Sequence, residues 1–390
     1  MFNGLEIDML ALGDADCIVV THWGHLGAQR VLIDGGNASD IPAIKEFLRS
    51  KSMTNFWAVV CTHLHNDHAR GLIKLVEDQS ITIHTAWMHD IRKHIAPDVL
   101  RRASSGNSSQ ADGVKEIWEN TKDLAGAFAR RGLSPQEPFA GLKIADYPLL
   151  KILGPSLPFY QQVLREFTKV EVPSFTPPPV SFLETLSAIG GTAPRARYGT
   201  LRDMLDPSPE TMYGIVPPAP AYGSLLSTLA GVLENSSVKK NPETQPFNNT
   251  SAILGIIFNG QRLMLTGDAG SAALDAIPPE WKQLLWMQVP HHGSEGNLSQ
   301  SNIERFCPKF AYVSARGDMS HPSKAIVNGL IKVGSQVFST HSQSLPGHLW
   351  FHEGTVPARM GYGPAISLKG IAEPVFDPNW LSGLSARRAF

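Results

Sequence analysis

A short segment of the sequence, THLHNDH at residues 62–68, gathers three histidines and one aspartate directly behind the apolar run FWAVVC. Imidazole and carboxylate groups bind divalent ions such as Zn²⁺ without help from thiolates. In a tight turn, His63 and His65 can point to the same side and share one ion, while Asp67 and His68 can face a second ion. So dense a cluster favours a two-ion site over a purely structural role.

Other apolar runs of the sequence also lead to acidic or histidine residues. These are Asp34 after RVLI, Asp268 after RLMLTG, the pair His291 and His292 after LLWMQVP, and His321 in the loop after FAYVS. In layered α/β proteins, sites form where strand ends open onto loops. The pattern therefore predicts that these side chains meet the histidine cluster at one rim of a sheet.

A two-ion site also needs a carboxylate that both ions share, and Asp268 suits this role. A pair of ions can generate hydroxide near neutral pH and can stabilise the charge that develops in a displacement reaction. Zn²⁺ suits such nitrogen and oxygen ligands, and Mn²⁺ fits them as well. The sequence therefore favours a hydrolase with two divalent metal ions. The alternative for Asp268 is a turn-forming aspartate after glycine.

The elements that must position these residues begin with alternating strands and helices. The expected strands are residues 17–20, 30–36, 56–61, 80–88 and 147–156, the last running into a turn. The expected helices are residues 40–50, 69–78, 113–132 and 158–167. Ser-rich residues 100–112 indicate a polar loop.

Alternating strands and loops are expected again from residue 247 onward. A hairpin is expected between residues 251–258 and 262–270, joined by NGQ, and residues 321–334 have helical spacing. Further strands are expected within residues 284–294, 310–318, 335–343 and 347–352.

The intervening residues 169–246 are rich in Pro and Gly, which predicts a long insertion that serves as a lid or as a partner-binding segment. Residues 1–168 and 247–390 would then form one catalytic domain.

Composition narrows the class of protein further. With 390 residues, 42% of them hydrophobic, the chain can bury one large core or two ordinary ones. The 34 basic and 35 acidic residues give a net charge of -1, which argues against a general nucleic-acid or membrane-surface coat. Cys17, Cys61 and Cys307 suggest neither a disulfide framework nor a thiolate zinc site. We expect a cytoplasmic protein with no signal peptide and no membrane span.

These motifs resemble those of the metallo-β-lactamase fold superfamily. THLHNDH matches its HxHxDH signature, and LIDGG before it and LTGDA after it match the flanking motifs in the same order. A closer resemblance, over residues 5–95 and 247–355, is to the hydrolase domain of the ComEC/Rec2 DNA-uptake proteins and its free-standing relatives. It is carried by LGDADCIVV, NNTSAILGIIFNGQRLMLTGDA, VPHHGSEGN and VSARGDMSHP, with LKILGPSLPFY as a further match.

The resemblance implies an αββα sandwich with a dinuclear metal site on its edge. Carried over residue by residue, the ligands are His63 and His65 for one ion, Asp67 and His68 for the other, the shared Asp268, and the late histidine His291. Asp34 corresponds to the aspartate that supports the histidine loop.

The chain also departs from the family pattern. The third histidine of the first ion is not obvious. His89 at a strand end is the candidate, with His84 behind it, although a histidine there can simply form hydrogen bonds. Ala15 stands where the DNA-uptake relatives usually carry glycine. Their membrane channel is absent, so DNA transport is not implied.

Several residues near the motifs keep two interpretations. His292 either supports a ligand or contacts substrate, and His321 is either a proton donor to the leaving group or an ordinary loop histidine. Asp34 either supports the histidine loop or only makes the turn before Gly35. Asp16 either lies near the site or is a turn residue.

The motifs favour a metal-dependent phosphodiesterase, most simply a nuclease, with Asp67, His292 and His321 in catalytic roles. An amide, ester or thioester hydrolase on the same fold is the alternative. A metal-binding partner protein without catalysis is a third hypothesis. Three basic pairs could contact phosphates or could be solvated surface: Arg101-Arg102, Arg130-Arg131 and Lys239-Lys240.

Overall fold

The computed structural model describes residues 4–24, 27–105, 108–142, 144, 147, 149–168, 238–315, 321–340, 355–356 and 365–366. The chain divides into two compact units, residues 1–170 with 221–390 and residues 171–220. The second unit lies outside the described residues, as does most of the predicted insertion. The role of the insertion as a lid or as a partner-binding segment therefore stays a prediction.

The first sheet comes from the N-terminal part of the chain and has the strand order β1-β2-β3-β4-β5. The strands are β1 (Gly4–Met9), β2 (Ile18–Gly24), β3 (Gly27–Ile33), β4 (Asn55–Val60) and β5 (Thr82–Trp87). β1, β2 and β3 are antiparallel, and β3, β4 and β5 are parallel. β1 was not among the expected strands, although its apolar residues alternate as in a half-buried strand: Leu5, Ile7 and Met9.

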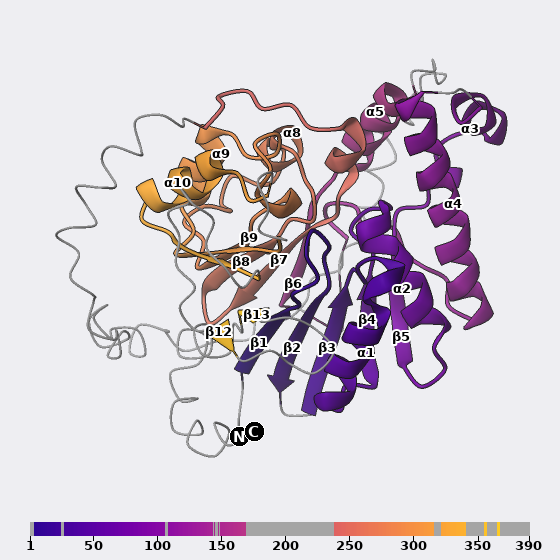
Figure 1. Ribbon diagram of the computed structural model, residues 1–390, viewed down its shortest axis with the longest axis horizontal. Helices are drawn as coiled ribbons and strands as arrows, with labels where there is room; N and C mark the ends of the chain where they lie inside the picture. Colours follow the sequence, from indigo (N-terminus) through magenta and orange to yellow (C-terminus); the bar gives the residue numbers. More distant parts are fainter. Residues whose placement is uncertain are drawn as a thin grey trace, which may run out of the picture. The chain divides into compact units, whose positions relative to one another are not determined.

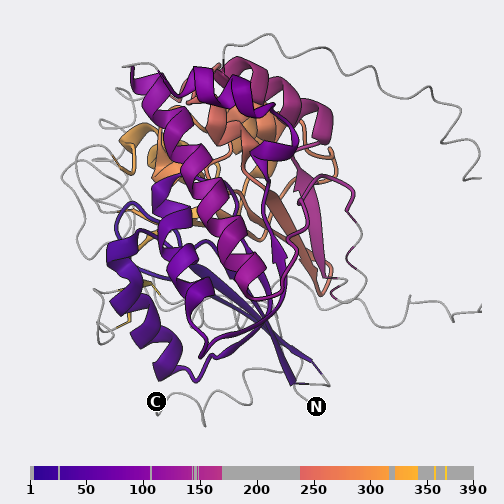
Figure 2. The same ribbon diagram turned by 90° about the vertical axis from the view of Figure 1, so that its right-hand side faces the viewer.

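Helices cover the outer face of the first sheet, as Figures 1 and 2 show. They are α1 (Ile41–Ser50), α2 (Asn66–Glu77), α3 (Pro97–Ala103), α4 (Ser109–Arg130) and α5 (Leu157–Thr168), with the short turns η1 (Ala38–Asp40) and η2 (Ile91–Lys93). The expected loop at residues 100–112 is wrong, because α3 and α4 occupy most of it. Ser108 explains the early start of α4, since its hydroxyl accepts a hydrogen bond from the amide of Ala111.

The second sheet has the order β11-β10-β9-β8-β7-β6. Its strands are β6 (Leu150–Gly154), β7 (Ile253–Phe258), β8 (Gln261–Leu265), β9 (Trp286–Gln288), β10 (Phe310–Val313) and β11 (Gln336–Ser339). β6, β7 and β8 are antiparallel, and β8 to β11 are parallel. The expected hairpin is confirmed. Asn259 and Gly260 take the left-handed backbone (φ 49° and 75°) that its tight turn requires.

The remaining short elements include η4 (Pro246–Thr250), α8 (Ser271–Asp275), η5 (His291–Gly293), α9 (Gln300–Phe306) and α10 (Lys324–Lys332). A separate strand pair is formed by β12 (Thr355–Val356) and β13 (Ala365–Ile366). The strand expected at 347–352 lies outside the described residues. Residues 238–246, assigned to the insertion by sequence, meet α9, where the amide of Gln300 donates to the backbone oxygen of Lys239 (3.2 Å). No helix in the described part of the chain is both long and apolar enough to cross a membrane.

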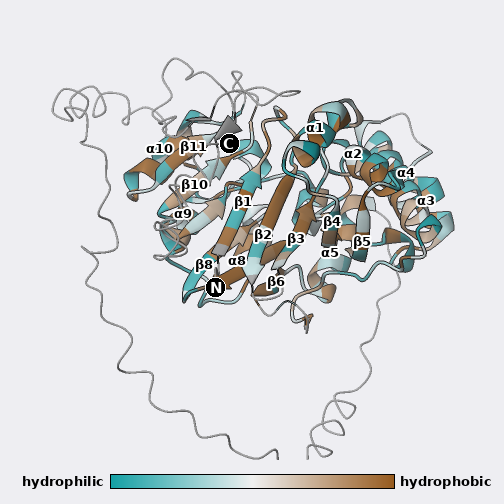
Figure 3. Cartoon of the chain, turned by 90° about the horizontal axis from the view of Figure 1, so that it is seen from below, coloured by the Kyte–Doolittle hydropathy of each residue, from teal (hydrophilic) through white to brown (hydrophobic). Residues whose placement is uncertain are grey.

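Within the residues that the structure describes, three apolar cores define the layers. One lies between the first sheet and helices α1, α2, α4 and α5, and a second joins inward residues of both sheets, such as Ile7, Val31, Leu254 and Tyr312. The third lies between the second sheet and helices α8, α9 and α10. Figure 3 shows the apolar strands between these two groups of helices. The fold is thus mixed α/β, with two facing mixed sheets.

Helix α2 approaches the turn after β3 so closely that glycine is required at the contact. The amide of Gly71 donates to the oxygen of Gly36 (2.8 Å), and the amide of Gly35 donates to the oxygen of His68 (2.9 Å). A Cβ on Gly71 would lie 1.9 Å from the oxygen of Gly35. This contact fixes His68 beside Asp34.

Replacing Gly71→Ala should lower the free energy of unfolding by about 1–3 kcal/mol, because the two backbones must move apart. Gly113→Ala in α4 is the matched control, since the nearest atom to its Cβ would be Cε2 of Phe167 at 4.0 Å. We expect Gly113→Ala to stabilise the protein by about 0.5–1 kcal/mol. Urea unfolding followed by circular dichroism measures both. Similar values for the two variants would contradict the close-contact argument.

Candidate metal centre

The polar residues after several strands converge on one region. β3 and β4 of the first sheet lead to Asp34 and His63, and β8 and β9 of the second sheet lead to Asp268 and His291. Among the described residues, three groups each have ligand atoms that all lie within 4.8 Å of one another: Asp16 with Asp34 and His68, and two groups that contain Asp268. One group is His63, His65 and Asp268, and the other is Asp67, His68, Asp268 and His292.

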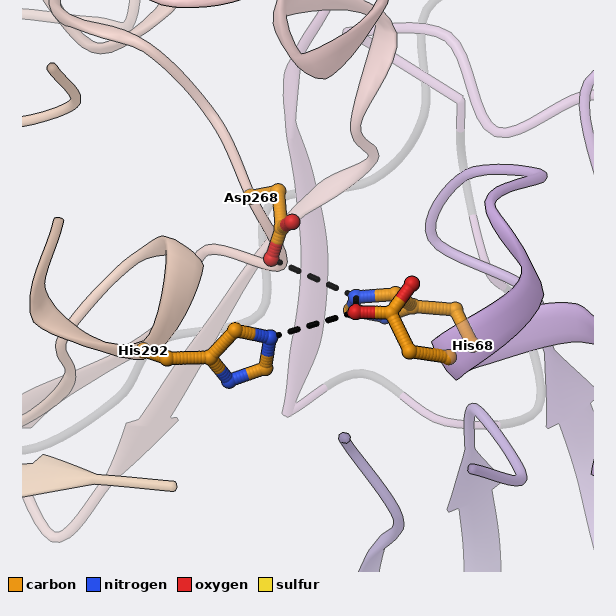
Figure 4. A group of neighbouring side chains, drawn as sticks. His68, Asp268 and His292 are labelled. Carbon is orange, nitrogen blue, oxygen red and sulfur yellow. Dashed lines mark hydrogen bonds and ion pairs between the residues drawn. The ribbon is translucent and has the colours of Figure 1, made fainter. Parts of the chain in front are cut away.

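Asp268 belongs to both groups because its two carboxylate oxygens face different histidines. Oδ2 lies 3.6 Å from Nε2 of His63 and 3.7 Å from Nε2 of His291, whereas Oδ1 lies 3.3 Å from Nε2 of His68. Figure 4 shows Asp268 and His292 pointing toward His68 on α2. We call Asp268 Oδ2 with His63, His65 and His291 the first cluster, and Asp268 Oδ1 with Asp67, His68 and His292 the second cluster.

The segment that carries the histidines is held from both sides. The carboxylate of Asp34, at a left-handed turn (φ 57°), accepts hydrogen bonds from the amide (2.8 Å) and hydroxyl (2.6 Å) of Thr62. It also accepts from Nδ1 of His68 (2.8 Å). On the other side, Asn120 of α4 donates to the backbone oxygen of Leu64 (2.8 Å). These bonds fix the backbone on which the ligand atoms lie.

Two adjacent histidines reach different oxygens of Asp268 because their backbone is unusual. His291, His292 and Gly293 are all left-handed, with φ of 49°, 55° and 80°. A Cβ on Gly293 would lie 2.7 Å from Cβ of Pro322, so glycine is required there. The tight turn sends the side chain of His291 to the first cluster and that of His292 to the second.

In the second cluster, Nδ1 of each ring is bonded away from the centre, to Asp34 or to the backbone of Ser314, so Nε2 of each ring faces inward. Nδ1 of His292 donates to the backbone oxygen of Ser314 (2.8 Å), so Nε2 is the nitrogen that faces Oδ2 of Asp67 at 3.3 Å. Nε2 of His68 and Oδ1 of Asp268 are buried and form no regular hydrogen bond among the described residues. A nitrogen and an oxygen without hydrogen bonds are suitable ligand atoms for a divalent cation.

In the first cluster, Nε2 of His63 and Nδ1 of His65 lie 2.9 Å apart and point to the same side. Burial lowers the pKa of His63 well below its usual value, and the charge of His68 lowers it further. Burial also lowers the pKa of His65. Both rings are therefore neutral near pH 7, which is the form that binds metal ions.

The acids of the second cluster favour protonated histidines instead. Burial opposes charge on His292, but the hydrogen bond to Asp67 and the charges of Asp16 and Asp268 outweigh it and raise the pKa to about 9. Burial also opposes charge on His68, yet its facing carboxylates, Asp268 foremost, hold its pKa well above the usual value. In the ion-free chain, protons therefore occupy positions where cations would bind.

His89 does not join either cluster. It is buried between the rings of Phe139 and Tyr160, with centroid distances of 4.7 and 4.6 Å. Burial, with a smaller effect of His94, lowers its pKa to about 3. His84 is exposed and bonds Asn55 (3.0 Å). The expectation that His89 completes the first cluster is therefore corrected: β5 ends at the edge of its sheet, and α5 covers that end.

His321 lies at the site. Its ring centroid is 5.7 Å from that of His291 and 6.0 Å from that of His292, and its Nδ1 lies 3.9 Å from Oδ2 of Asp14.

His292, expected to support a ligand or contact substrate, instead offers a ligand atom of its own.

The sequence analysis left Asp16 undecided and missed Gln288. Asp16 is buried, and its Oδ2 accepts from Nε2 of Gln288 (2.7 Å). Oε1 of Gln288 accepts from the amides of Thr266 and Gly267 (3.0 and 3.2 Å), so the amide ties Asp16 to the turn that carries Asp268. A buried glutamine in a strand gives no recognisable sequence signal of this role.

Binding of Zn²⁺ to the second cluster should release protons, because His292 has a pKa of about 9 and is protonated at neutral pH. Below that pKa, the apparent affinity for Zn²⁺ should increase about tenfold for each unit by which the pH rises and for each proton displaced. Calorimetric titrations in buffers of different ionisation enthalpy count the protons. Asp67→Asn removes the hydrogen-bonded carboxylate, so it should lower the number released at pH 7.5. Zn²⁺ binding without proton release would contradict the assignment.

Comparisons with known proteins give a limited likeness. No family model and no curated protein matches the chain. Among solved structures, a Thermotoga maritima protein provisionally named a metallo-beta-lactamase is similar, with 15% identity and a TM-score of 0.26. The match covers 38% of this chain and 65% of that protein, so the chain spans less than two thirds of its length. Because so small a likeness carries no argument, the family is proposed below from the motifs and the site geometry.

Proposed function

We propose that the protein is a metal-dependent hydrolase of the metallo-β-lactamase type, related to the ComEC/Rec2 hydrolase domain, that cleaves phosphodiester bonds, most simply in a nucleic acid. The observation that carries this proposal is the position of Asp268, whose two oxygens face separate sets of imidazole nitrogens at 3.3–3.7 Å. A carboxylate shared in this way is the donor arrangement of a two-ion site. The layered sheets and helices agree with the αββα sandwich that the motifs imply.

A pair of divalent ions bound here would supply an activated water molecule near neutral pH and would neutralise charge on the phosphoryl oxygens. The chain itself holds the donors in place. The amide of Asp268 donates to the hydroxyl of Ser251 (3.2 Å), which fixes the shared carboxylate in its turn. Asp34 orients the ring of His68, and the backbone of Ser314 orients the ring of His292. The ligand atoms are thereby positioned before a substrate arrives.

We assign the proton that the leaving oxygen requires to His321. Its side chain keeps 25% of its surface exposed beside both clusters, so a substrate can reach it. Its Nδ1 lies 3.9 Å from Oδ2 of Asp14, a carboxylate that can hold the ring in place beside the clusters.

The support for a phosphodiester substrate is the HHGS motif, which the nuclease-like branch of the superfamily carries. The Arg130-Arg131 pair does not add to it. Arg131 donates to the backbone oxygens of Val76, Asp78 and Ile81, and Arg130 pairs with Glu77 (2.8 Å). These charges are used within the protein rather than offered to a phosphate.

A cleavage panel tests the proposal with linear, circular and single-stranded DNA, RNA, bis(p-nitrophenyl) phosphate, and a generic ester and thioester, in Mn²⁺ or Zn²⁺. Asp67→Asn and Asp268→Asn should each lower phosphodiester cleavage by about 10³-fold or more. Asp78→Asn, at an acid that pairs with Lys45 on the surface, should cleave like wild type. Equal cleavage by all variants would place the activity elsewhere. Cleavage of ester or thioester substrates alone would replace the phosphodiesterase by the other hydrolase class.

His321→Gln should lower kcat by about 10²–10⁴-fold, because a proton donor is lost. Stoichiometric binding of two ions should persist. His84→Gln is the control, since this exposed histidine bonds only Asn55 among the residues that the structure places. A His321→Gln enzyme with an unchanged kcat would show that the residue is an ordinary loop histidine.

A further inference from the structure

His291 is held by an asparagine whose orientation is fixed at its other end. Asn297 is fully buried, and its Nδ2 donates to the backbone oxygen of Asp268 (2.7 Å). Its Oδ1 lies 2.9 Å from Nδ1 of His291. A backbone oxygen only accepts hydrogen bonds, so the amide nitrogen must face it and the amide oxygen must face the ring. Nδ1 of His291 therefore carries the hydrogen.

The consequence lies at the opposite nitrogen. With the hydrogen on Nδ1, a neutral His291 presents the lone pair of Nε2 to Oδ2 of Asp268 at 3.7 Å. Two acceptors that face each other attract only through a cation or a proton between them. The same Oδ2 faces Nε2 of His63 at 3.6 Å, so both rings converge on one position.

A second asparagine contacts the same nitrogen. The amide of Asn248 lies 3.2 Å from Nδ1 of His291 and 2.9 Å from the hydroxyl of Thr244, while its Oδ1 is buried without a partner among the described residues. The amide nitrogen of Asn248 donates to Thr244, whereas the hydrogen on Nδ1 of His291 goes to Oδ1 of Asn297, which is the nearer of the two asparagines at 2.9 Å.

We propose that Asn297 is a positioning residue that selects the Nδ1-protonated form of His291 and thereby makes His291 the third imidazole of the first cluster. This inference rests on the metal binding proposed above. Among the described residues, its side chain bonds His291 and the backbone oxygens of residues 268 and 269, and no histidine of the second cluster. Its effect is therefore specific to one of the two ions, and it also couples the ring to the turn of Asp268.

Asn297→Ala and Asn297→Asp are compared with wild type, and Asn302→Ala serves as the control. Asn302 is equally buried in the same segment, but it bonds Ser299 and Asp275. Two measurements are made on the whole chain. Nitrogen-15 NMR of the ion-free protein reports the tautomer of His291, assigned by comparison with His291→Gln. Calorimetric titration with Zn²⁺ reports each binding step separately.

Asn297→Ala should shift His291 toward the Nε2-protonated form and should weaken one Zn²⁺ step by about 10–100-fold, with the other step unchanged. Asn297→Asp keeps an acceptor for Nδ1–H, so the tautomer of His291 should stay as in wild type, although the hydrogen bond to the backbone oxygen of Asp268 is lost. Asn302→Ala should lower stability without changing either step.

An unchanged tautomer in Asn297→Ala, or equal weakening of both steps, would overturn the inference. If Asn297→Ala does not fold, Asn297→Asp decides, because a shifted tautomer of His291 in that variant would also overturn the inference. A wild-type protein that binds no Zn²⁺ would refute the metal centre itself. The tautomers of the ion-free proteins would still decide whether Asn297 selects the form of His291.

Discussion

The carboxylate of Asp268 imposes the constraint on which the rest of the site depends. Its two oxygens must face different donors, so the chain must bring imidazoles to both sides of one buried side chain. The first sheet supplies the segment with His63 and His68, and the second sheet supplies Asp268 and His292. Neither half of the chain can assemble either cluster alone. The apolar core that joins the two sheets therefore has a functional role, because it holds the two sets of strand ends together.

This arrangement is costly and needs support. Removing charged side chains from water costs several kcal/mol each unless hydrogen bonds compensate, and left-handed backbone at non-glycine residues costs about 1–3 kcal/mol each. Asp34, His291 and His292 all carry such backbone, with φ of 57°, 49° and 55°. The compensation comes from groups that satisfy the remaining atoms, such as Thr62 on the carboxylate of Asp34. Strain collected at adjacent ligand positions is what allows His291 and His292 to serve different clusters.

The sequence predicted much of this because strand ends and turn residues have local signals. The His63–His68 segment, the turn at Asp268 and most strands and helices follow from hydrophobic runs and motif spacing. The roles of His291 and His292 could not be divided in this way, because they depend on a backbone turn that no propensity specifies. The prediction that His89 is a ligand was wrong for a related reason. A position just after a strand places a residue at the end of the sheet where the clusters lie, but it does not say how far across the sheet that strand is from them. In the sequence, Asn297 cannot be told apart from any other loop asparagine, because its role depends on partners that only the structure shows.

The two clusters differ in a way that follows from their neighbours rather than from their ligands. Both contain imidazoles and one oxygen of Asp268, yet burial keeps His63 neutral while surrounding acids hold His68 protonated. The difference arises because Asp34 and Asp67 both lie beside His68, and Asp16 adds its charge near His292. An ion that enters the first cluster therefore meets free nitrogen lone pairs, whereas one that enters the second must displace protons. One shared carboxylate thus joins two sites whose occupancy responds differently to pH.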